Sequence, residues 1–452
     1  MRAPRPTILL SLVVTGLIAV ACTPGGETTQ ASVPPPPATT GVPNTGPITL
    51  TVWDQESGQV SKIWDQLNAE FEAKYPNVTI QRVNRDLGEL KALLRLALQG
   101  GNGPDIAEVN QGWPDMGALV KGGLLLPLEN YAEAYGWNDQ VSENVLSVSS
   151  WSPDGKQWGS GNLFGYTTMG EIVGVYYNKQ TLADLGLEVP TTLAEFEQAL
   201  EAAKQAGKVP IQFGNNDAFP GIHEYSVVQD RTASTSYLTD LIFGAQGTGQ
   251  SFDTPENVKA AAILQDWVAK GYFTPGFGGG GYDDAVANFA KGEGLFMITG
   301  NWIVANLGAN STNFGFFLLP GQGADDPAVS TGGAGYPLSI AAGSDNPDAA
   351  AAYIDWMTSA HASDLLLQTG QIPLSRGASA ATQPGTLLAE VLDAVAKANA
   401  DNGVVPYEDW ATPTFYDTMT AAIQELMANR ISPEEFAAKV QEDYAAFQGS
   451  RA

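Results

Sequence analysis

Flat aromatic side chains recur beside carboxylates and amides in the polar loops that follow predicted strands. The residues in four such loops are Trp53, Asp54 and Glu56; Asn110, Gln111 and Trp113; Asp217, Phe219 and His223; and Asn301 and Trp302. An aromatic ring can cover the apolar C–H face of a sugar ring, while carboxylates and amides hydrogen-bond to its hydroxyls. The pattern therefore predicts a binding site for a polyhydroxylated, uncharged ring.

Each aromatic residue also has a packing interpretation, because aromatic side chains dominate protein cores as well as binding sites. Three tryptophans lie at apolar helix spacing and are predicted to be core: Trp64, Trp267 and Trp356. Trp137, Trp151 and Trp158 flank a polar, Gly-rich stretch and could lie on a surface or at a rim, whereas Trp410 has a loop context like Trp53, Trp113 and Trp302. His223, taken alone, is more typical of a structural histidine.

Strands and helices alternate along the chain and must position these loops. Residues 48–53, 78–83 and 106–109 alternate with helical patterns, which indicates crossover connections and a mostly parallel sheet. The same order reappears later, with strands over 171–178, 209–213, 295–299 and 338–341. We therefore expect an α/β protein with two lobes, in which ligands bind off the carboxyl ends of the strands.

Composition excludes several classes of function. Among 452 residues, 22 Lys and Arg face 49 Asp and Glu, for a net charge of −27, so the basic footprint of a nucleic-acid binder is absent. One Cys and two His rule out a disulfide framework and sites that need several Cys or His ligands. No G-x-S-x-G, HExxH or Walker A motif occurs, and the glycines of 276–281 lack a following Lys-Ser or Lys-Thr. We expect no catalytic residue, metal or cofactor.

The N-terminus resembles a bacterial lipoprotein signal. Arg2 and Arg5 precede an apolar run over residues 8–20, and Cys22 directly follows small residues. We expect residues 1–21 to be removed and Cys22 to be lipidated; an uncleaved anchor or a stray thiol is the alternative. Residues 22–47 are rich in Pro, Thr and Gly and are predicted to be a solvated tether. The protein would then be lipid-anchored on the outer face of the cytoplasmic membrane.

The folded part resembles the extracellular solute-binding proteins of ABC sugar importers, the family that contains the maltodextrin-binding protein. The segments that carry the resemblance are TLTVWD, FEAKYP, GNGPDI with GGLLLPL, GVYYNK with VPTTLAEF, FAKGEGLFMITGNW and ISPEEFAAKVQ, in this order. The resemblance implies a two-lobed fold of the periplasmic-binding-protein kind with one sugar-binding cleft. Lobe 1 would be 48–170 plus about 336–380, and lobe 2 would be 171–335 plus about 381–452.

The resemblance also implies which side chains bind the sugar. Trp53, Asp54, Asn110, Gln111 and Trp113 would lie at the rim of lobe 1, and Glu171 would bind sugar hydroxyls. Asp217 and Phe219 would be a carboxylate and an aromatic from lobe 2, Trp302 would be a stacking platform, and Phe415 or Tyr416 would be a second one. The candidates that the resemblance does not supply are Glu56, His223, Tyr336 and Trp410.

The implied mechanism is hinge closure around the ligand. Chain crossings near Gly170, Gly335 and Ile372 would let the lobes rotate together, and a permease would recognise the closed form. The expected partners are a carbohydrate ligand, the permease subunits and, through the anchor, the membrane; the protein itself is expected to be a monomer. Two alternatives stay open: a secreted glycoside hydrolase, and the same fold binding a polyamine or a metal cation.

Overall fold

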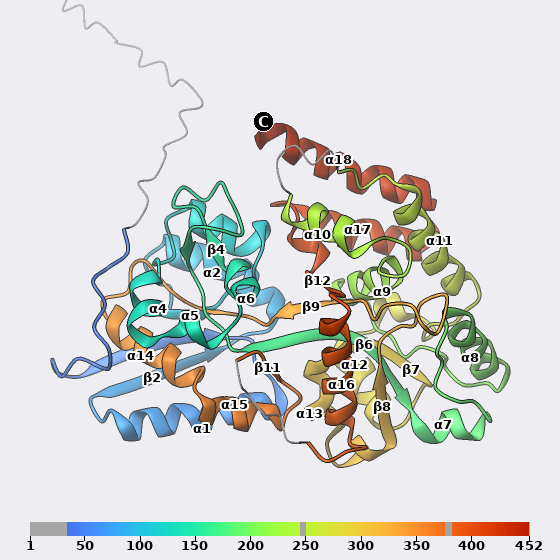
Figure 1. Cartoon of the computed structure of the whole chain (residues 1–452), viewed down its shortest axis with the longest axis horizontal. Helices are drawn as coiled ribbons and strands as arrows, with labels where there is room; N and C mark the ends of the chain where they lie inside the picture. Colours follow the sequence, from blue (N-terminus) through green and yellow to red (C-terminus); the bar gives the residue numbers. More distant parts are fainter. Residues whose placement is uncertain (1–33, 245–249, 376–381, 452) are drawn as a thin grey trace, which may run out of the picture.

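Two lobes joined by crossing strands make up the structure, a computed structural model that describes residues 34–244, 250–375 and 382–451 (Figure 1). Each lobe is built around its own principal sheet, with helices packed against it. The predicted two-lobed α/β fold is confirmed.

Lobe 1 has a four-stranded sheet in the order β10-β3-β1-β2. β1 (Ile48–Asp54) pairs in parallel with β2 (Val78–Asn84) and β3 (Ile106–Glu108), and β10 (Leu338–Ile340) runs antiparallel to β3. The predicted parallel pairing is therefore correct here, with β10 as the exception. The other elements of this lobe are α1 (Gly58–Lys74), α2 (Leu87–Gln99), α3 (Ala118–Lys121), α4 (Glu129–Tyr135), α5 (Trp137–Gln140), α6 (Glu143–Ser147), β4 (Ser150–Trp151), β5 (Asn162–Leu163), α14 (Pro347–Met357) and α15 (Ala360–Leu367).

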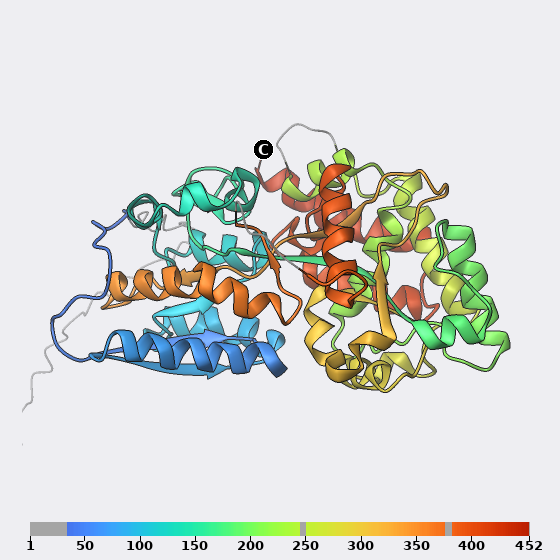
Figure 2. The same cartoon turned by 60° about the horizontal axis from the view of Figure 1, so that its bottom comes forward.

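The sequence pattern of α1 explains its packing. Val60, Trp64, Leu67 and Phe71 recur at helical spacing and are all buried, while the residues between them are mostly exposed or partly exposed. Their stripe faces α14 and α15, which lie alongside α1 although almost 300 residues separate them in sequence (Figure 2). The helix ends before Pro76, as expected from the restricted backbone of a residue that precedes proline.

Lobe 2 is organised around the ten-residue strand β6 (Met169–Asn178). Its partners β7 (Phe296–Gly300), β8 (Phe314–Phe317), β9 (Ser330–Ala334) and β11 (Ile372–Pro373) all run antiparallel to it. Parallel pairing in this lobe is found between β12 (Val404–Val405) and β9 and in the isolated bridges from Ile211 to Phe273 and Phe296. The expectation of a mostly parallel sheet is therefore wrong for this lobe. The helices are α7 (Lys179–Asp184), α8 (Leu193–Gln205), α9 (Phe219–Gln229), α10 (Thr235–Phe243), α11 (Pro255–Ala269), α12 (Tyr282–Ala290), α13 (Val304–Leu307), α16 (Leu387–Ala400), α17 (Phe415–Met427) and α18 (Pro433–Arg451).

Of two sequence predictions for lobe 2, the capping box is confirmed and the strand over 209–213 is not. Thr192 and Glu195 form the predicted capping box at the start of α8. The strand predicted over 209–213 is reduced to isolated bridges made by Ile211, because Pro210 lacks an N–H and Gly214 packs closely against the carbonyl of Gly281.

The three passages between the lobes lie side by side. In the register of the sheet, Gly170 of β6 is paired with Ile372 of β11 on one side and with Ala334 of β9 on the other. A Cβ on Gly170 would lie 2.7 Å from the end of the Leu374 side chain and 3.1 Å from the carbonyl oxygen of Gly333, so the two neighbouring passages pack closely on this glycine. The predicted crossings near Gly170, Gly335 and Ile372 therefore form one hydrogen-bonded ribbon.

The lobes also touch away from the crossings. Gly112 of lobe 1 packs directly on Trp410, and a Cβ on Gly112 would lie 2.4 Å from the Cβ of Trp410. Trp158 contacts Phe243, with ring centroids 4.6 Å apart, and Trp113 contacts Phe447 at 4.9 Å. Trp158 is buried, as are Trp137 and Trp151, so none of these three lies on the surface.

The segment before β1 follows the surface of lobe 1. Pro36 O accepts a hydrogen bond from Asn130, Gly41 N donates to the hydroxyl of Tyr135, and Asn77 donates to the carbonyls of Pro43 and Gly46. Residues 36–46 thus differ from the predicted solvated tether, since the backbone groups of this Pro-rich segment find side-chain partners on the lobe. Cys22 lies outside the described residues. Among the residues described, no helix has the length and apolar composition needed to cross a membrane.

Candidate functional site

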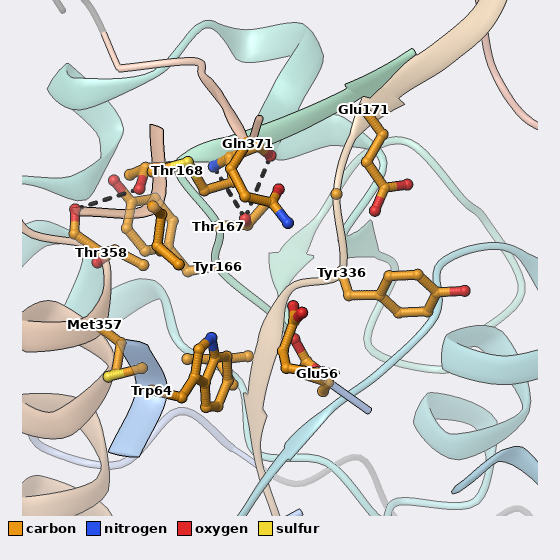
Figure 3. Close-up of a pocket in the computed structure, with 15 residues that line it drawn as sticks. Glu56, Trp64, Tyr166, Thr167, Thr168, Glu171, Tyr336, Met357, Thr358 and Gln371 are labelled. Carbon is orange, nitrogen blue, oxygen red and sulfur yellow. Dashed lines mark hydrogen bonds between the residues drawn. The ribbon is translucent and has the colours of Figure 1, made fainter. Parts of the chain in front are cut away.

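A polar cavity lies against all three passages between the lobes (Figure 3). Passage residues supply Thr167 to Met169 and Glu171 from the first crossing, Gly335 and Tyr336 from the second, and Gln371 from the third. The rest of the wall comes from lobe 1: Glu56, Trp64, Glu108, Tyr166, Leu338, Met357, Thr358 and Leu366. A molecule bound here would contact every segment that connects the two lobes.

Three carboxyl groups face this cavity. Glu56 and Glu108 lie at the carboxyl ends of β1 and β3, and their side chains share a hydrogen bond. Burial raises the pKa of Glu56 to about 7 and that of Glu108 well above its usual range, where the negative charges of Glu56 and Asp54 also raise it. Burial likewise raises the pKa of Glu171 to about 8. At neutral pH these three carboxyl groups are therefore protonated to a larger extent than carboxyl groups exposed to solvent.

Gln371 supplies an amide at the hinge side of the cavity. Its residue is 9% exposed, its side chain makes no hydrogen bond to the described residues, and its amide is directed into the space that Glu56 and Glu171 also face (Figure 3). Buried amides are normally hydrogen-bonded, so this group is available to a bound molecule. Trp64 and Met357 form an apolar wall beside it.

A second pocket lies next to the cavity, and Glu108 and Tyr336 line both. The ammonium group of Lys91 lies 3.1 Å from a carboxylate oxygen of Asp115 and 3.6 Å from the ring centroid of Tyr416, across the lobe boundary. Asn110 also donates to Asp115. The positive charge of Lys91 is thus already matched within the protein.

A chain of aromatic contacts in lobe 2 connects several predicted site residues. Trp302 Nε1 donates a 2.7 Å hydrogen bond to the hydroxyl of Tyr282, whose backbone N–H donates to Asp217. The ring of His223 lies 5.5 Å from that of Trp302 and 6.0 Å from that of Tyr407. Phe219 packs on His223 and Tyr282. Burial lowers the pKa of His223 to about 4, so this imidazole is neutral at physiological pH.

Tyr407 connects this chain to the cavity. Its hydroxyl donates a 3.2 Å hydrogen bond to Glu171 Oε2. The structure therefore brings Trp302, Asp217 and Glu171 into one contiguous network, although only Glu171 of the three lines the cavity.

Several predicted site residues have structural roles instead. Trp53 is 8% exposed, belongs to the same core cluster as Leu90 and Leu94 of α2, and lies beneath the guanidinium of Arg85. Asp54 is fully buried and accepts two hydrogen bonds from Arg82, at 2.6 and 2.7 Å, which occupy its carboxylate. Gln111 donates to the carbonyls of Ala334 and Gly335. Trp113, Trp410 and Phe415 are buried among other aromatic rings.

Other site residues were absent from the predicted set: Glu108, Tyr282, Gln371, Tyr407 and Asp409. Glu108 lies inside the strand predicted over 106–109, and a rule that considers only the residues after each strand missed it; in the structure β3 ends at Glu108. Tyr407 and Asp409 follow β12, a strand of two residues that leaves no periodic signal. Burial raises the pKa of Asp409 to about 6, and Lys91 opposes that rise from the other lobe.

Two lobes with a polar cavity at their crossing strands define the class of two-lobed solute-binding proteins. Residues 55–363 match the family of bacterial extracellular solute-binding proteins, and the chain belongs to that family.

Relatives and solved structures resemble the chain over most of its length. It is 21% identical over 336 residues to the multiple sugar-binding protein of Streptococcus mutans, which covers 70% of this chain and 72% of the relative. Among solved structures, a chitin oligosaccharide binding protein has a TM-score of 0.78 at 22% identity, covering 89% of this chain and 99% of that one. Maltose-bound MalE3 of T. maritima has a TM-score of 0.69 at 16% identity, with 88% and 99% covered. At these identities the structural likeness establishes the fold.

Proposed function

We propose that this protein is the lipid-anchored substrate-binding component of an ABC transporter, which captures a sugar or oligosaccharide between its lobes and delivers it to the permease. Membership of the extracellular solute-binding family supports the receptor role, and the multiple sugar-binding relative supports the kind of ligand. The carboxyl, amide and aromatic groups around the cavity are suited to sugar hydroxyls and ring faces.

The observation that carries the proposal is the contact of one cavity with all three chain passages. A ligand bound there interacts with lobe 1 and with every connecting segment at once, so it can favour one relative orientation of the lobes. Shifting a two-state equilibrium requires such differential contacts in the two states, and hinge closure is the corresponding motion.

Calorimetry with a panel of mono- and oligosaccharides tests the proposal. Binding of at least one saccharide, with the sugar recovered intact and a raised melting temperature, is the expected result, because a ligand of the folded state stabilises it. Recovery of shorter sugars would instead support the glycoside hydrolase alternative. Glu56 and Glu108 are hydrogen-bonded to each other, closer than the roughly 5–9.5 Å separation of glycosidase carboxyl pairs, so these two groups do not form such a pair.

The anchor is tested separately through Cys22. In bacterial cells that express the full chain, we expect the wild-type protein to fractionate with the membrane and to incorporate a labelled fatty acid. Cys22→Ala should abolish the label and release the protein, and an unlabelled wild type would exclude lipidation. Light scattering of the purified folded part should give the mass of one chain.

A further inference from the structure

The carboxyl groups of the cavity have no matching positive charge. Among the described residues that line it, three are Glu and none is Lys, Arg or His. Arg82 lies behind the wall, but its two ion pairs are with other carboxylates, Asp54 at 2.6 Å and Asp65 at 2.7 Å. Buried carboxylates normally require a partner because desolvation of an unpaired charge is costly. The cavity therefore favours a ligand that brings a positive charge with it.

A metal ion does not fit this arrangement. Across residues 34–244, 250–375 and 382–451, no three His, Cys, Asp or Glu side chains are placed to hold one. Glu56 and Glu108 face each other, while Glu171 extends from β6 and is held by Tyr407. An organic cation, in which the charge is carried on a larger polar body, suits this spacing better.

The uncharged side chains of the cavity indicate the chemistry of the rest of the cationic ligand. The buried Gln371 amide is unpartnered and can both donate and accept hydrogen bonds, and Tyr336 presents a half-buried ring and hydroxyl group between Glu171 and the second pocket. Trp64 provides an apolar face. A protonated linear polyamine can donate to the Gln371 carbonyl but has no acceptor for its NH2 group, whereas an amine-bearing sugar has hydroxyl oxygens that can accept from it.

We propose that the solute is an amino sugar whose protonated amine binds between Glu171 and Glu56, with an adjacent hydroxyl hydrogen-bonded to Gln371. This inference rests on the proposed sugar-binding function and specifies its ligand class. Binding of the cation stabilises the ionised carboxylates. Because Glu56 and Glu171 have raised pKa values, complex formation near neutral pH releases protons from them.

The test compares matched saccharides that differ in one substituent. Glucose, glucosamine and N-acetylglucosamine, the corresponding galactose series, and the β-1,4-linked disaccharides of the gluco series are titrated into the folded part by calorimetry at pH 7. Two buffers of different ionisation enthalpy measure proton release. We expect an amine to bind at least tenfold more tightly than its hydroxyl and acetamido counterparts, with proton release and with an affinity that falls as salt is added.

Variants separate the cavity from the overall charge of the protein. Glu171→Gln should remove most of the amine preference while the protein remains folded, as judged by its melting curve. Glu133→Gln removes one charge from an exposed site on α4 and should leave the preference unchanged. If Glu171→Gln unfolds the protein, the same measurement on Glu56→Gln decides.

Each outcome has a distinct meaning. A neutral or acetylated sugar that binds as tightly as its amine overturns the amino-sugar inference and leaves the sugar-binding function standing. Binding of spermidine without any saccharide overturns both, as does the absence of binding by every compound.

Discussion

The Tyr407 hydroxyl group donates a 3.2 Å hydrogen bond to Glu171 Oε2, and this contact joins the segment after β12 to the first strand that crosses between the lobes. Glu171 is a carboxyl group on a hinge strand, so its orientation depends on a residue 236 positions later in the sequence. The pair relates the ligand cavity to the aromatic network of lobe 2.

Tyr407→Phe should therefore weaken ligand binding without removing a cavity side chain. Loss of a hydrogen bond to a charged group costs about 1.5–3 kcal/mol, which predicts a decrease in affinity of roughly ten- to a hundredfold. Calorimetry with the best saccharide from the panel measures it. The same substitution should raise the pKa of Glu171 further, since the hydroxyl favours the ionised form. An unchanged affinity would mean that Glu171 does not contact the ligand.

Trp302→Ala should lower sugar affinity at least tenfold while the melting temperature changes little. Trp302 does not line the cavity, so the effect would act through His223 and Tyr407, which connect its ring to Glu171. The ring is half-buried and folds back over Gly300, where any Cβ would lie 1.9 Å from it, so it covers the end of β7. The matched control is Trp267→Ala, a fully buried tryptophan whose truncation should cost about 3–5 kcal/mol of unfolding free energy. If Trp302→Ala destabilises the fold as much as the control and retains affinity, Trp302 is a core residue.

Gly112→Ala should hold the lobes apart. A methyl group there would lie 2.4 Å from the Cβ of Trp410, and Gly112 has a φ of 79°. Gly136→Ala introduces the same backbone strain at a φ of 71° with nothing within 4 Å, so it serves as the control. With ligand present, small-angle scattering should give a larger radius of gyration for the Gly112 variant than for the control. Equal radii would show that this contact does not limit closure.

Stability should fall as pH rises from about 6.5 to 8, above the range in which His223 titrates and up to the raised pKa of Glu408. Burial raises the pKa of Asp230 to about 7 and that of Glu408 to about 8, above the ordinary carboxyl range, so the native state binds more protons than the unfolded state in this interval. Stability supplied by such groups is present at low pH and is lost as pH passes through the raised pKa. His223, with a lowered pKa, acts in the opposite direction but mainly below pH 6.5.

Urea unfolding at several pH values measures this loss. Each raised carboxyl contributes a slope of up to about 1.4 kcal/mol per pH unit. Glu408→Gln should reduce the slope of the unfolding free energy against pH by the contribution of one carboxyl group. A wild-type free energy that does not change over this pH interval would contradict the assignment of buried, protonated carboxyls.

Much of the fold could be predicted because its signals are local. The apolar stripe of α1 and the capping box of α8 each depend on a few neighbouring residues, whereas the crossing near Gly170 was predicted from the family resemblance. The antiparallel arrangement around β6 could not be predicted in this way, because its partners come from segments more than a hundred residues away.

The candidate site was only partly predictable for a related reason. The residues after predicted strands included Glu56, and the family resemblance pointed to Glu171. Neither kind of reasoning could show that the carboxylate of Asp54 is paired with Arg82. That pair depends on the register of β1 against β2, which places Val52 beside Arg82 and leaves the guanidinium within reach of Asp54. Gln371 lay next to a predicted crossing, yet its role depends on a cavity that only the folded chain forms.

The path of residues 36–46 along lobe 1 has a mechanical consequence. If the protein is attached to a surface through its N-terminus, this segment transmits the pull to lobe 1 alone, through Asn77, Asn130 and Tyr135. Lobe 1 would then stay fixed relative to that surface while lobe 2 moves. The attachment therefore sets the direction in which the space between the lobes opens.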